Sequence, residues 1–292
     1  MSSKILSLFS NIEKREEIAS FVFSYLKKFG YINNDSPLSD IVKGIIAFRK
    51  MASLMEGDTI DDKLIKAMTA PRCLLPDNEH FEEANALPKW GLKKVTYALN
   101  GYDSDVTEQE WGATFEKAFS QITDVCGISF ERVNGPSNII ISLGSGAADQ
   151  FDGPSGVLAW CELPSTTSYT GRIQSKFDKA ETWVPFGRTG RGIYLLNVAC
   201  HELLHGMGLS HTNVPGSLMN PFYDPNIEKP QSDDIMKLEM RYGKPKVNPI
   251  VPPTPIVPTP SIPSTPTSPT SIIITGKIDK IEIPGYRVQK IG

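Results

Sequence analysis

Along the first 70 residues, hydrophobic positions recur at the spacing of an α-helix. The first set stops before Gly30, and its members are Ile18, Phe21, Val22, Tyr25 and Phe29. Two shorter sets follow, one just after Ser39 and one after Thr59, which forms a capping-box-like pattern with Asp62. The pattern predicts a small bundle of three amphipathic helices that ends at "APRCLLPD", 70–77.

From Trp90 onward the chain alternates between short apolar runs and longer helical patterns. The apolar runs predict strands at 93–99, 127–133, 137–143 and 155–163. Helical spacing predicts helices at 106–122 with Thr107 and Glu110 as a capping box, at 191–208, and at 232–243 behind Ser232. We therefore expect an α+β domain in this part of the chain.

Beyond Lys244 the composition shifts to Pro, Thr and Ser, which predicts an extended linker over 245–271. Residues 272–292 alternate between apolar and polar positions and could form one hairpin, which is too short to be stable alone. The sequence does not identify a partner for this tail.

Composition and charge narrow the classes of function. A net charge of −3 with scattered basic residues disfavours nucleic-acid binding, and no segment reaches the roughly 20 apolar residues that span a bilayer. The N-terminus has no cleavage-site pattern of a signal peptide. Four cysteines are too few for a disulfide scaffold, and their redox state is left open: Cys73, Cys126, Cys161 and Cys200.

The stretch "VACHELLHGMGLSH", 198–211, carries the strongest chemical pattern in the chain. Helical residues four apart share a face, so His201 and His205 can bind one zinc ion, with Glu202 beside them. Gly208 can adopt a positive φ that ends the helix and turns the chain back. His211 can then serve as the third ligand.

Three histidines leave one coordination position open, as is typical of a catalytic zinc. In this interpretation the ion activates a water, and Glu202 is the general base that takes its proton and passes it to the leaving amine. The alternative is a buried helix whose histidines merely pack. The length of the motif disfavours that alternative. Three of the chain's 4 histidines also stand in this motif, which disfavours it further.

Cys73, in "PRCLLPD", is a candidate for the open position. A thiolate is a good zinc ligand, and the charge of Arg72 favours the thiolate. If this segment crosses the cleft, the sulfur replaces the water and the protein is latent, with Arg72 and Asp77 pairing to brace the loop. The alternative is an ordinary free cysteine.

With both motifs present, residues 20–243 resemble a matrixin, a matrix-metalloproteinase-type zymogen of the metzincin clan. The chain matches the family segment P-R-C-G-[VN]-P-D at every position except two, where it has Leu74 and Leu75. The sequence "LMNPFY" matches the Met-turn, which places Met219 as an apolar floor beneath the ligands. Thr212 departs from the usual serine after the third histidine.

The resemblance implies an α+β catalytic domain, with a twisted mixed sheet and long helices, over 81–244. A three-helix propeptide with a cysteine switch would precede it over 1–80. Phe81 stands where the mature N-terminus often begins, and its new ammonium could pair with Asp233 or Asp234, which also suit the start of a helix.

The resemblance also implies calcium. "FDGPSGV" and "KFDKAETW" match the family's calcium loop, and the alternative is a solvated acidic turn. The ligands carried over are the side chains of Asp152, Asp178 and Glu181 and the carbonyls of Gly153, Ser155 and Val157. The family's second, structural zinc would fall on residues that are not plausible ligands, so one zinc is expected; these residues are Ser145, Ala147, Trp160 and Lys176.

The same resemblance places an extended peptide substrate on "GVLAWCE", at Val157, Leu158 and Ala159. A specificity pocket would be walled by Pro221, Phe222 and Tyr223, with Asn197 as a possible floor. The preferred side chain is not predicted.

The sequence therefore predicts a latent zinc endopeptidase that hydrolyses internal peptide bonds of proteins and is released by an activating protease. One alternative is a catalytically silent zinc-binding module, tethered by the linker to an assembly or a surface, which Glu202 disfavours. Another is a gluzincin-type protease with a distant glutamate ligand, which His211 disfavours. The family usually acts outside the cell on extracellular matrix, so an extracellular location is expected although no export signal is recognised.

Overall fold

Over residues 12–77, the described N-terminal part of the protein is a bundle of three helices. The computed structural model describes residues 12–77 and 87–245; the linker beyond residue 245 and the predicted hairpin at 272–292 lie outside them. The helices are α2 (Ile12–Lys28), α3 (Leu38–Met51) and α4 (Asp62–Met68). The predicted cap of α4 is wrong, because the Asp61 carboxylate, and not Thr59, accepts from the Leu64 backbone N–H, at 2.8 Å.

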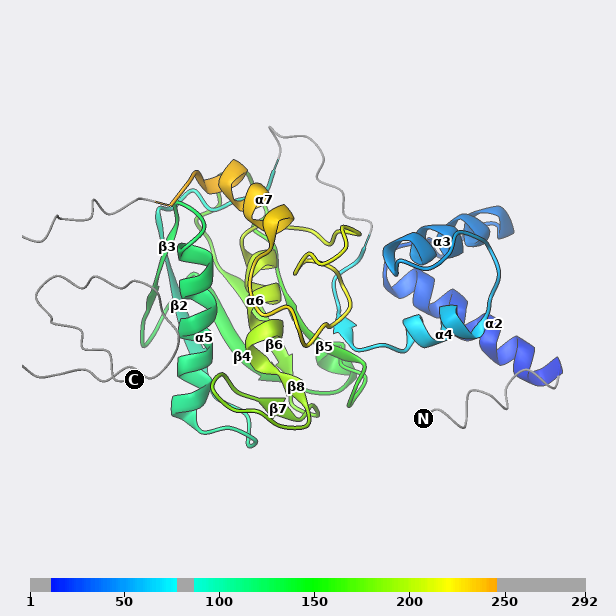
Figure 1. Ribbon diagram of the computed structural model, residues 1–292, viewed down its shortest axis with the longest axis horizontal. Coiled ribbons are helices and arrows are strands. Elements are labelled where there is room, and N and C mark those ends of the chain that lie inside the picture. The colour runs from blue at the N-terminus through cyan, green and yellow to red at the C-terminus, as the bar shows by residue number, and fades with distance from the viewer. Residues whose placement is uncertain (1–11, 78–86, 246–292) are drawn as a thin grey trace, which may run out of the picture. The chain divides into compact units, whose positions relative to one another are not determined.

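A six-stranded sheet forms the centre of the second part, in the order β1-β5-β6-β4-β2-β3 (Figure 1). The strands are β1 (Arg72–Cys73), β2 (Lys94–Asn100), β3 (Ser129–Arg132), β4 (Ile139–Gly144), β5 (Val157–Cys161) and β6 (Ile173–Asp178). Every neighbouring pair is parallel except β5 and β6, so the sheet is mixed, as predicted. A second sheet pairs β7 (Trp183–Val184) with β8 (Ile193–Tyr194).

The helices α5 (Glu108–Thr123) and α6 (Leu195–Gly206) lie side by side on one face of this sheet (Figure 1). The predicted capping box of α5 is present, since Thr107 and Glu110 cap each other. The last helix, α7 (Ser232–Tyr242), lies in the predicted segment, but Gln231 and not Ser232 is its N-cap. All residues of α6 are buried, which places any chemistry on this helix inside the protein.

Two hydrophobic cores hold the described residues together. One lies between the sheet and helices α5 and α6 and contains Trp111, Phe115, Phe177 and Leu203. The other fills the helical bundle, and it also takes in Val157 of β5. The bundle therefore shares its apolar core with β5, the strand expected to bind substrate.

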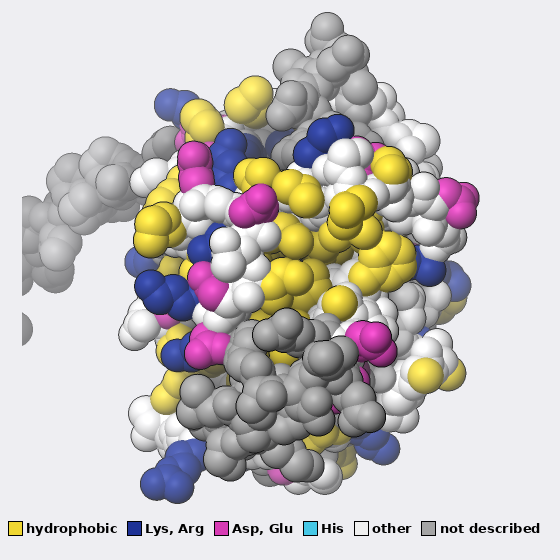
Figure 2. Space-filling view, turned by 90° about the vertical axis from the view of Figure 1, so that its right-hand side faces the viewer, with side chains coloured by type: hydrophobic (Ala, Val, Ile, Leu, Met, Phe, Trp, Pro, Cys, Tyr) yellow, Lys and Arg dark blue, Asp and Glu magenta, His cyan; other side chains and the backbone are white. Residues whose placement is uncertain are grey.

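Hydrophobic side chains also gather on the outer face shown in Figure 2, among lysines, arginines and acidic residues. Exposed large hydrophobics in the bundle include Leu38 and Met55. Among the described residues, no helix is both long and apolar enough to cross a membrane.

Candidate metal centre

Two histidines of helix α6, His201 and His205, direct their ring nitrogens toward the same site. The ring Nδ1 atoms of His201 and His205 lie 2.7 Å from the carbonyl oxygens of Leu218 and Leu209 respectively. A ring nitrogen next to a carbonyl must carry the proton, so Nδ1 donates and Nε2 is left free in both rings. Both free nitrogens point away from the helix toward a third imidazole.

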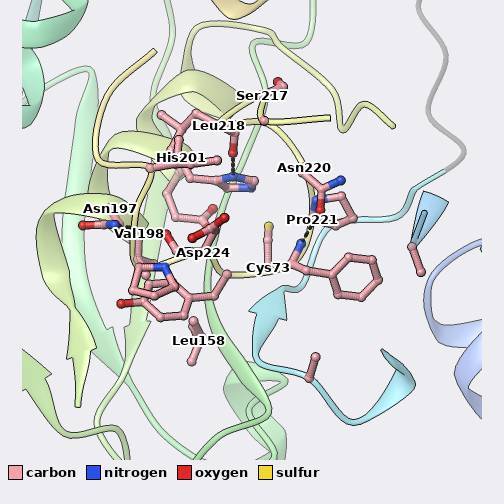
Figure 3. A pocket seen from close by; sticks show the side chains of 18 of the residues that line it. Cys73, Leu158, Asn197, Val198, His201, Ser217, Leu218, Asn220, Pro221 and Asp224 are labelled. Carbon is pink, nitrogen blue, oxygen red and sulfur yellow. Dashed lines mark hydrogen bonds between the residues drawn. The ribbon is translucent and has the colours of Figure 1, made fainter. Parts of the chain in front are cut away.

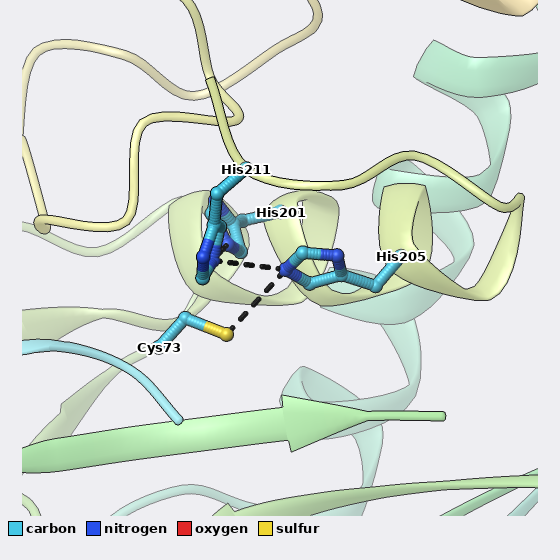
Figure 4. A group of neighbouring side chains, drawn as sticks. All are labelled: Cys73, His201, His205 and His211. Carbon is cyan, nitrogen blue, oxygen red and sulfur yellow. Dashed lines mark hydrogen bonds between the residues drawn. The ribbon is translucent and has the colours of Figure 1, made fainter. Parts of the chain in front are cut away.

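The third imidazole belongs to His211, which the chain brings back at Gly208. Gly208 has φ 85°, and a Cβ there would lie 2.0 Å from the carbonyl oxygen of Pro88, so only glycine fits. His211 Nε2 lies 3.3 Å from His201 Nε2 and 3.1 Å from His205 Nε2. The turn predicted from the glycine therefore brings the three ring nitrogens together (Figure 4).

A fourth donor approaches this group from β1. Cys73 Sγ lies 3.5 Å from His205 Nε2, and the ligand atoms of the four residues all lie within 4.8 Å of one another. All four side chains are buried. Three imidazoles and one sulfur form a donor set that suits zinc.

Main-chain hydrogen bonds on both sides hold the Cys73 segment in place. Arg72 N–H donates to the Gly156 carbonyl (3.0 Å) and Leu74 N–H donates to the Ala159 carbonyl (3.1 Å), next to β5. On the other side, Cys73 N–H donates to the Pro221 carbonyl (3.0 Å). The segment therefore fills the groove between β5 and residues 221–223.

The predicted pairing of Arg72 with Asp77 is present and buried. Arg72 Nη2 donates to Asp77 Oδ1 at 2.6 Å and Nη1 donates to Oδ2 at 3.1 Å. The sequence did not reveal that Asp77 Oδ1 also lies 2.8 Å from His211 Nδ1. The pairing between residues 134 positions apart has no local sequence signal.

Burial sets the protonation of this site in the absence of an ion. Burial lowers the pKa of His201 to about 3 and moves the pKa of His205 and His211 in the same direction. The imidazoles are therefore neutral, the form that binds metal.

The expectation that Arg72 makes Cys73 a thiolate needs a correction. Its pKa is raised above the usual range because burial outweighs the charge of Arg72, which acts more weakly. Arg72 is committed to Asp77, so it is not the group that makes a thiolate. A bound zinc ion would have to do so, since metals deprotonate coordinating thiols.

Glu202 lies on α6 between the two histidines and is fully buried. Neither of its carboxylate oxygens has a hydrogen-bond partner among the described residues. Burial raises its pKa to about 8. The Cys73 thiol is close enough for the two groups to shift each other's pKa. A buried carboxyl of this kind suits a proton acceptor that works near neutral pH.

The turn after the third histidine is organised by Asp234 of α7. Its carboxylate accepts from Ser217 Oγ (2.5 Å), from Leu218 N–H (2.8 Å) and from Met219 N–H (3.3 Å). Met219 is completely buried in the core that contains α6. Asp233 pairs with Lys237 at 2.7 Å, and Phe81, the predicted partner of these aspartates, lies outside the described residues.

A cavity of about 360 Å³ opens beside Cys73, His201 and Glu202 (Figure 3). It is lined by every residue predicted for the pocket: Asn197, Pro221, Phe222 and Tyr223, together with Leu158 of β5. Asn197 Nδ2 donates to the Asp224 carbonyl at 3.1 Å, so the amide is held at the cavity wall.

The three carboxylates predicted for calcium surround the loop before β5. Asp152 Oδ1 accepts from Val157 N–H (2.7 Å), and Glu181 Oε1 accepts from Ser155 N–H (2.6 Å). Asp178 is fully buried, and its Oδ2 has no partner among the described residues. The charges of Asp152 and Asp178 both act on Glu181, and an acidic group with an orphaned carboxylate oxygen is compatible with a hard cation. The predicted carbonyl ligands stay a prediction.

Two neighbours of this acidic group were not predicted. Asp103 is buried, its Oδ2 also lacks a partner in the described part of the chain, and burial raises its pKa. Lys28 of α2 lies 3.5 Å from Asp152 Oδ2, in an exposed ion pair between the bundle and the loop.

The positions that correspond to the family's second zinc carry an ion pair. Lys176 Nζ donates to Asp149 Oδ1 at 2.5 Å and lies 5.7 Å from the Trp160 ring centroid. The other Asp149 oxygen accepts from Ser145 N–H, at 2.9 Å. Trp160 Nε1 donates to the Asp149 carbonyl, at 3.1 Å. Asp149 therefore ties together three of the four positions; sequence reasoning had not singled it out.

The mixed sheet, the buried HExxH helix and the third histidine define the class of zinc-dependent metalloproteases. The matrixin family model matches residues 89–243, and the chain belongs to this family, peptidase family M10. The chain is 33% identical to macrophage metalloelastase of Rattus norvegicus, over 65% of this chain and 41% of the relative. It is 31% identical to interstitial collagenase of Equus caballus and 30% identical to matrix metalloproteinase-18 of Xenopus laevis, each over 82% of this chain and 52% of the relative. The chain thus spans about half the length of these curated relatives.

Proposed function

We propose that this chain is a latent zinc endopeptidase that is held inactive by Cys73. The observation that carries the proposal is the convergence of Cys73 Sγ with three neutral imidazoles next to the unpartnered carboxylate of Glu202. We assign residues 1–80 to the propeptide, 81–244 to the catalytic domain, 245–271 to a linker and 272–292 to a tail.

The reaction that this site supports is hydrolysis of a peptide bond. His201, His205 and His211 would hold a zinc ion, which would supply the Lewis acid that polarises the scissile carbonyl and makes the attacking water more acidic. Glu202 takes the proton from the attacking water and delivers it to the amine that leaves. A silent zinc-binding module would have no use for a buried carboxylate at this position.

Latency follows from the position of the N-terminal segment. Cys73 would take the ligand position that the attacking water needs, and β1 occupies the side of β5 on which an extended substrate would pair. Cutting the chain between 77 and 87 would release both contacts. The activating protease is a separate enzyme.

Protein substrates fit the open groove that would remain between β5 and Pro221–Tyr223. Relatives named collagenase and metalloelastase support extracellular matrix proteins as the substrate class and an extracellular location. One zinc serves the reaction, and calcium at Asp152, Asp178 and Glu181 stabilises the loop that precedes β5.

The test is peptide cleavage by the zinc-loaded protein before and after proteolytic removal of the N-terminal segment. Activity should appear only after removal and should be lost with a zinc chelator. Cys73→Ser in the full-length chain should raise activity above that of the unprocessed wild type, with Cys126→Ser as the matched control. Equal activity in processed and unprocessed protein would contradict latency.

A further inference from the structure

The three histidines differ in what holds their second ring nitrogen. His201 and His205 donate from Nδ1 to the Leu218 and Leu209 carbonyls, which belong to the same part of the chain as the helix that carries them. His211 Nδ1 instead lies 2.8 Å from Asp77 Oδ1. This contact comes from the N-terminal segment, so it exists only while that segment is in place.

Asp77 is itself fixed by the helical bundle. Its backbone N–H donates to the Phe29 carbonyl (3.0 Å), and Tyr31 Oη donates to its Oδ2 (2.5 Å). The two Arg72 contacts complete the shell around the carboxylate, and the Asp77 side chain is wholly buried. The carboxylate is thus presented to His211 in a single orientation.

We propose that Asp77 is a positioning residue for the third zinc ligand, and that it thereby slows the loss of zinc from the latent form. This rests on the proposed zinc site. By accepting the Nδ1 proton, the carboxylate fixes the His211 tautomer with Nε2 free, holds the ring orientation and makes the imidazole a stronger donor. The N-terminal segment would then act on the metal twice, through Cys73 directly and through Asp77 indirectly.

A purely structural role for Asp77 predicts different behaviour. In that case the carboxylate only pairs with Arg72 to hold the Cys73 loop, and it influences zinc solely through the sulfur. The two roles separate when the sulfur is removed, because the His211 contact does not depend on Cys73.

The experiment measures the rate at which full-length, zinc-loaded protein gives up zinc to a chromogenic chelator. The variants are Asp77→Asn, Arg72→Gln and Cys73→Ser, together with the double variant Asp77→Asn/Cys73→Ser. Loss of an outer-shell partner typically weakens metal binding about 10–100-fold. We expect Asp77→Asn to speed release about tenfold or more, both alone and in the Cys73→Ser background. Arg72→Gln, which leaves the carboxylate on His211, should have a smaller effect.

A second readout is the set of ring N–H proton signals in cobalt-substituted full-length protein. Three such signals are expected, one for each histidine, and Asp77→Asn should shift one and leave two in place. If Asp77→Asn fails to fold, Asp77→Glu, which keeps the charge but moves it, should shift the same signal.

Each outcome bears on a separate claim. Full-length wild type without stoichiometric zinc would overturn the proposed function itself. Zinc-loaded wild type, with no effect of Asp77→Asn in the Cys73→Ser background and no shift of a single ring signal, would overturn only the role of Asp77.

Discussion

Two regions of this protein correspond to zinc sites in its family, and they are built in opposite ways. Around His201, His205 and His211 every donor is present, buried and aimed at one point. At the positions expected for a structural zinc, Asp149 instead forms an ion pair with Lys176. The side chains of both residues are about a quarter exposed. The first region has the ligand atoms for a catalytic metal ion, whereas the second has only contacts that stabilise a loop.

The difference follows from what each ion has to do. A catalytic ion must polarise a carbonyl and activate water, and no side chain can replace that Lewis acid. An ion that only joins two strands and a loop provides positive charge and geometry. The Lys176 ammonium provides both, since it pairs with Asp149 and lies near the Trp160 ring.

The largest expected effect comes from the catalytic region. Glu202→Gln keeps the size of the side chain but removes the proton acceptor, so activity of the processed protein should fall about 10²–10⁴-fold. Bound zinc, measured by elemental analysis, should stay at one per chain because Glu202 is not a ligand. Glu108→Gln, on an exposed side chain in the first turn of α5 and outside the site, is the matched control. Persistent cleavage in the Glu202 variant would contradict the assigned mechanism.

The next effect concerns Glu181, whose pKa is raised to about 7, chiefly by burial. Because the folded state favours the neutral carboxyl, the folded chain holds more protons than the unfolded chain between about pH 4.5 and 7. Stability should therefore fall as pH rises through this window, by at most about 3.5 kcal/mol at about 1.4 kcal/mol for each pKa unit.

Calcium favours the charged carboxylate and should remove this loss. Thermal unfolding at pH 5 and pH 8, with calcium or with a calcium-selective chelator, measures both effects. Glu181→Gln should reduce both the loss of stability with rising pH and its reversal by calcium. A calcium-independent pH profile that is identical in wild type and variant would contradict calcium binding through Glu181.

A smaller effect is expected from the ion pair itself. Lys176→Met keeps the length of the side chain but leaves Asp149 without its cation, which should lower the unfolding free energy measured by denaturant titration. Lys94→Met, which removes the exposed pair with Glu131, should cost less than about 1 kcal/mol. Zinc content should remain at one per chain in both variants. If Lys176→Met instead loses zinc, the two regions are not independent.

The smallest effect is expected from Lys28, whose pair with Asp152 is exposed. Lys28→Met should change the unfolding free energy of the latent protein by about 0–1 kcal/mol. The rate of activation by a fixed amount of protease should remain close to that of wild type. A large acceleration would mean that this contact, and not Cys73, dominates the hold of the N-terminal segment.

Sequence reasoning found the parts of the fold that follow local rules. Helix α6 with its two histidines, the turn at Gly208 and the capping box of α5 depend on spacings of three to eight residues. It missed β1, β6 and both strands of the second sheet, because two-residue strands have no periodicity and β6 carries polar residues such as Gln174 and Lys176. These strands are defined by their neighbours in the sheet.

The same limit applies to the site. Cys73, His201, His205, His211 and Glu202 stand in two short motifs, so chemistry and spacing were enough to nominate them. The contacts of Asp77 with His211 and of Asp149 with Lys176 join residues 134 and 27 positions apart. Such pairs depend on how distant segments pack, and no local pattern in a single sequence predicts that packing.

The central claim is that a sulfur from the N-terminal segment completes a three-histidine zinc site. X-ray absorption at the zinc edge of the full-length protein, purified without added metal, tests it most directly. We predict one zinc per chain with three nitrogen neighbours at about 2.0–2.1 Å and one sulfur at about 2.3 Å, the sulfur vanishing in Cys73→Ser. A spectrum without sulfur, or a protein without stoichiometric zinc, would contradict it.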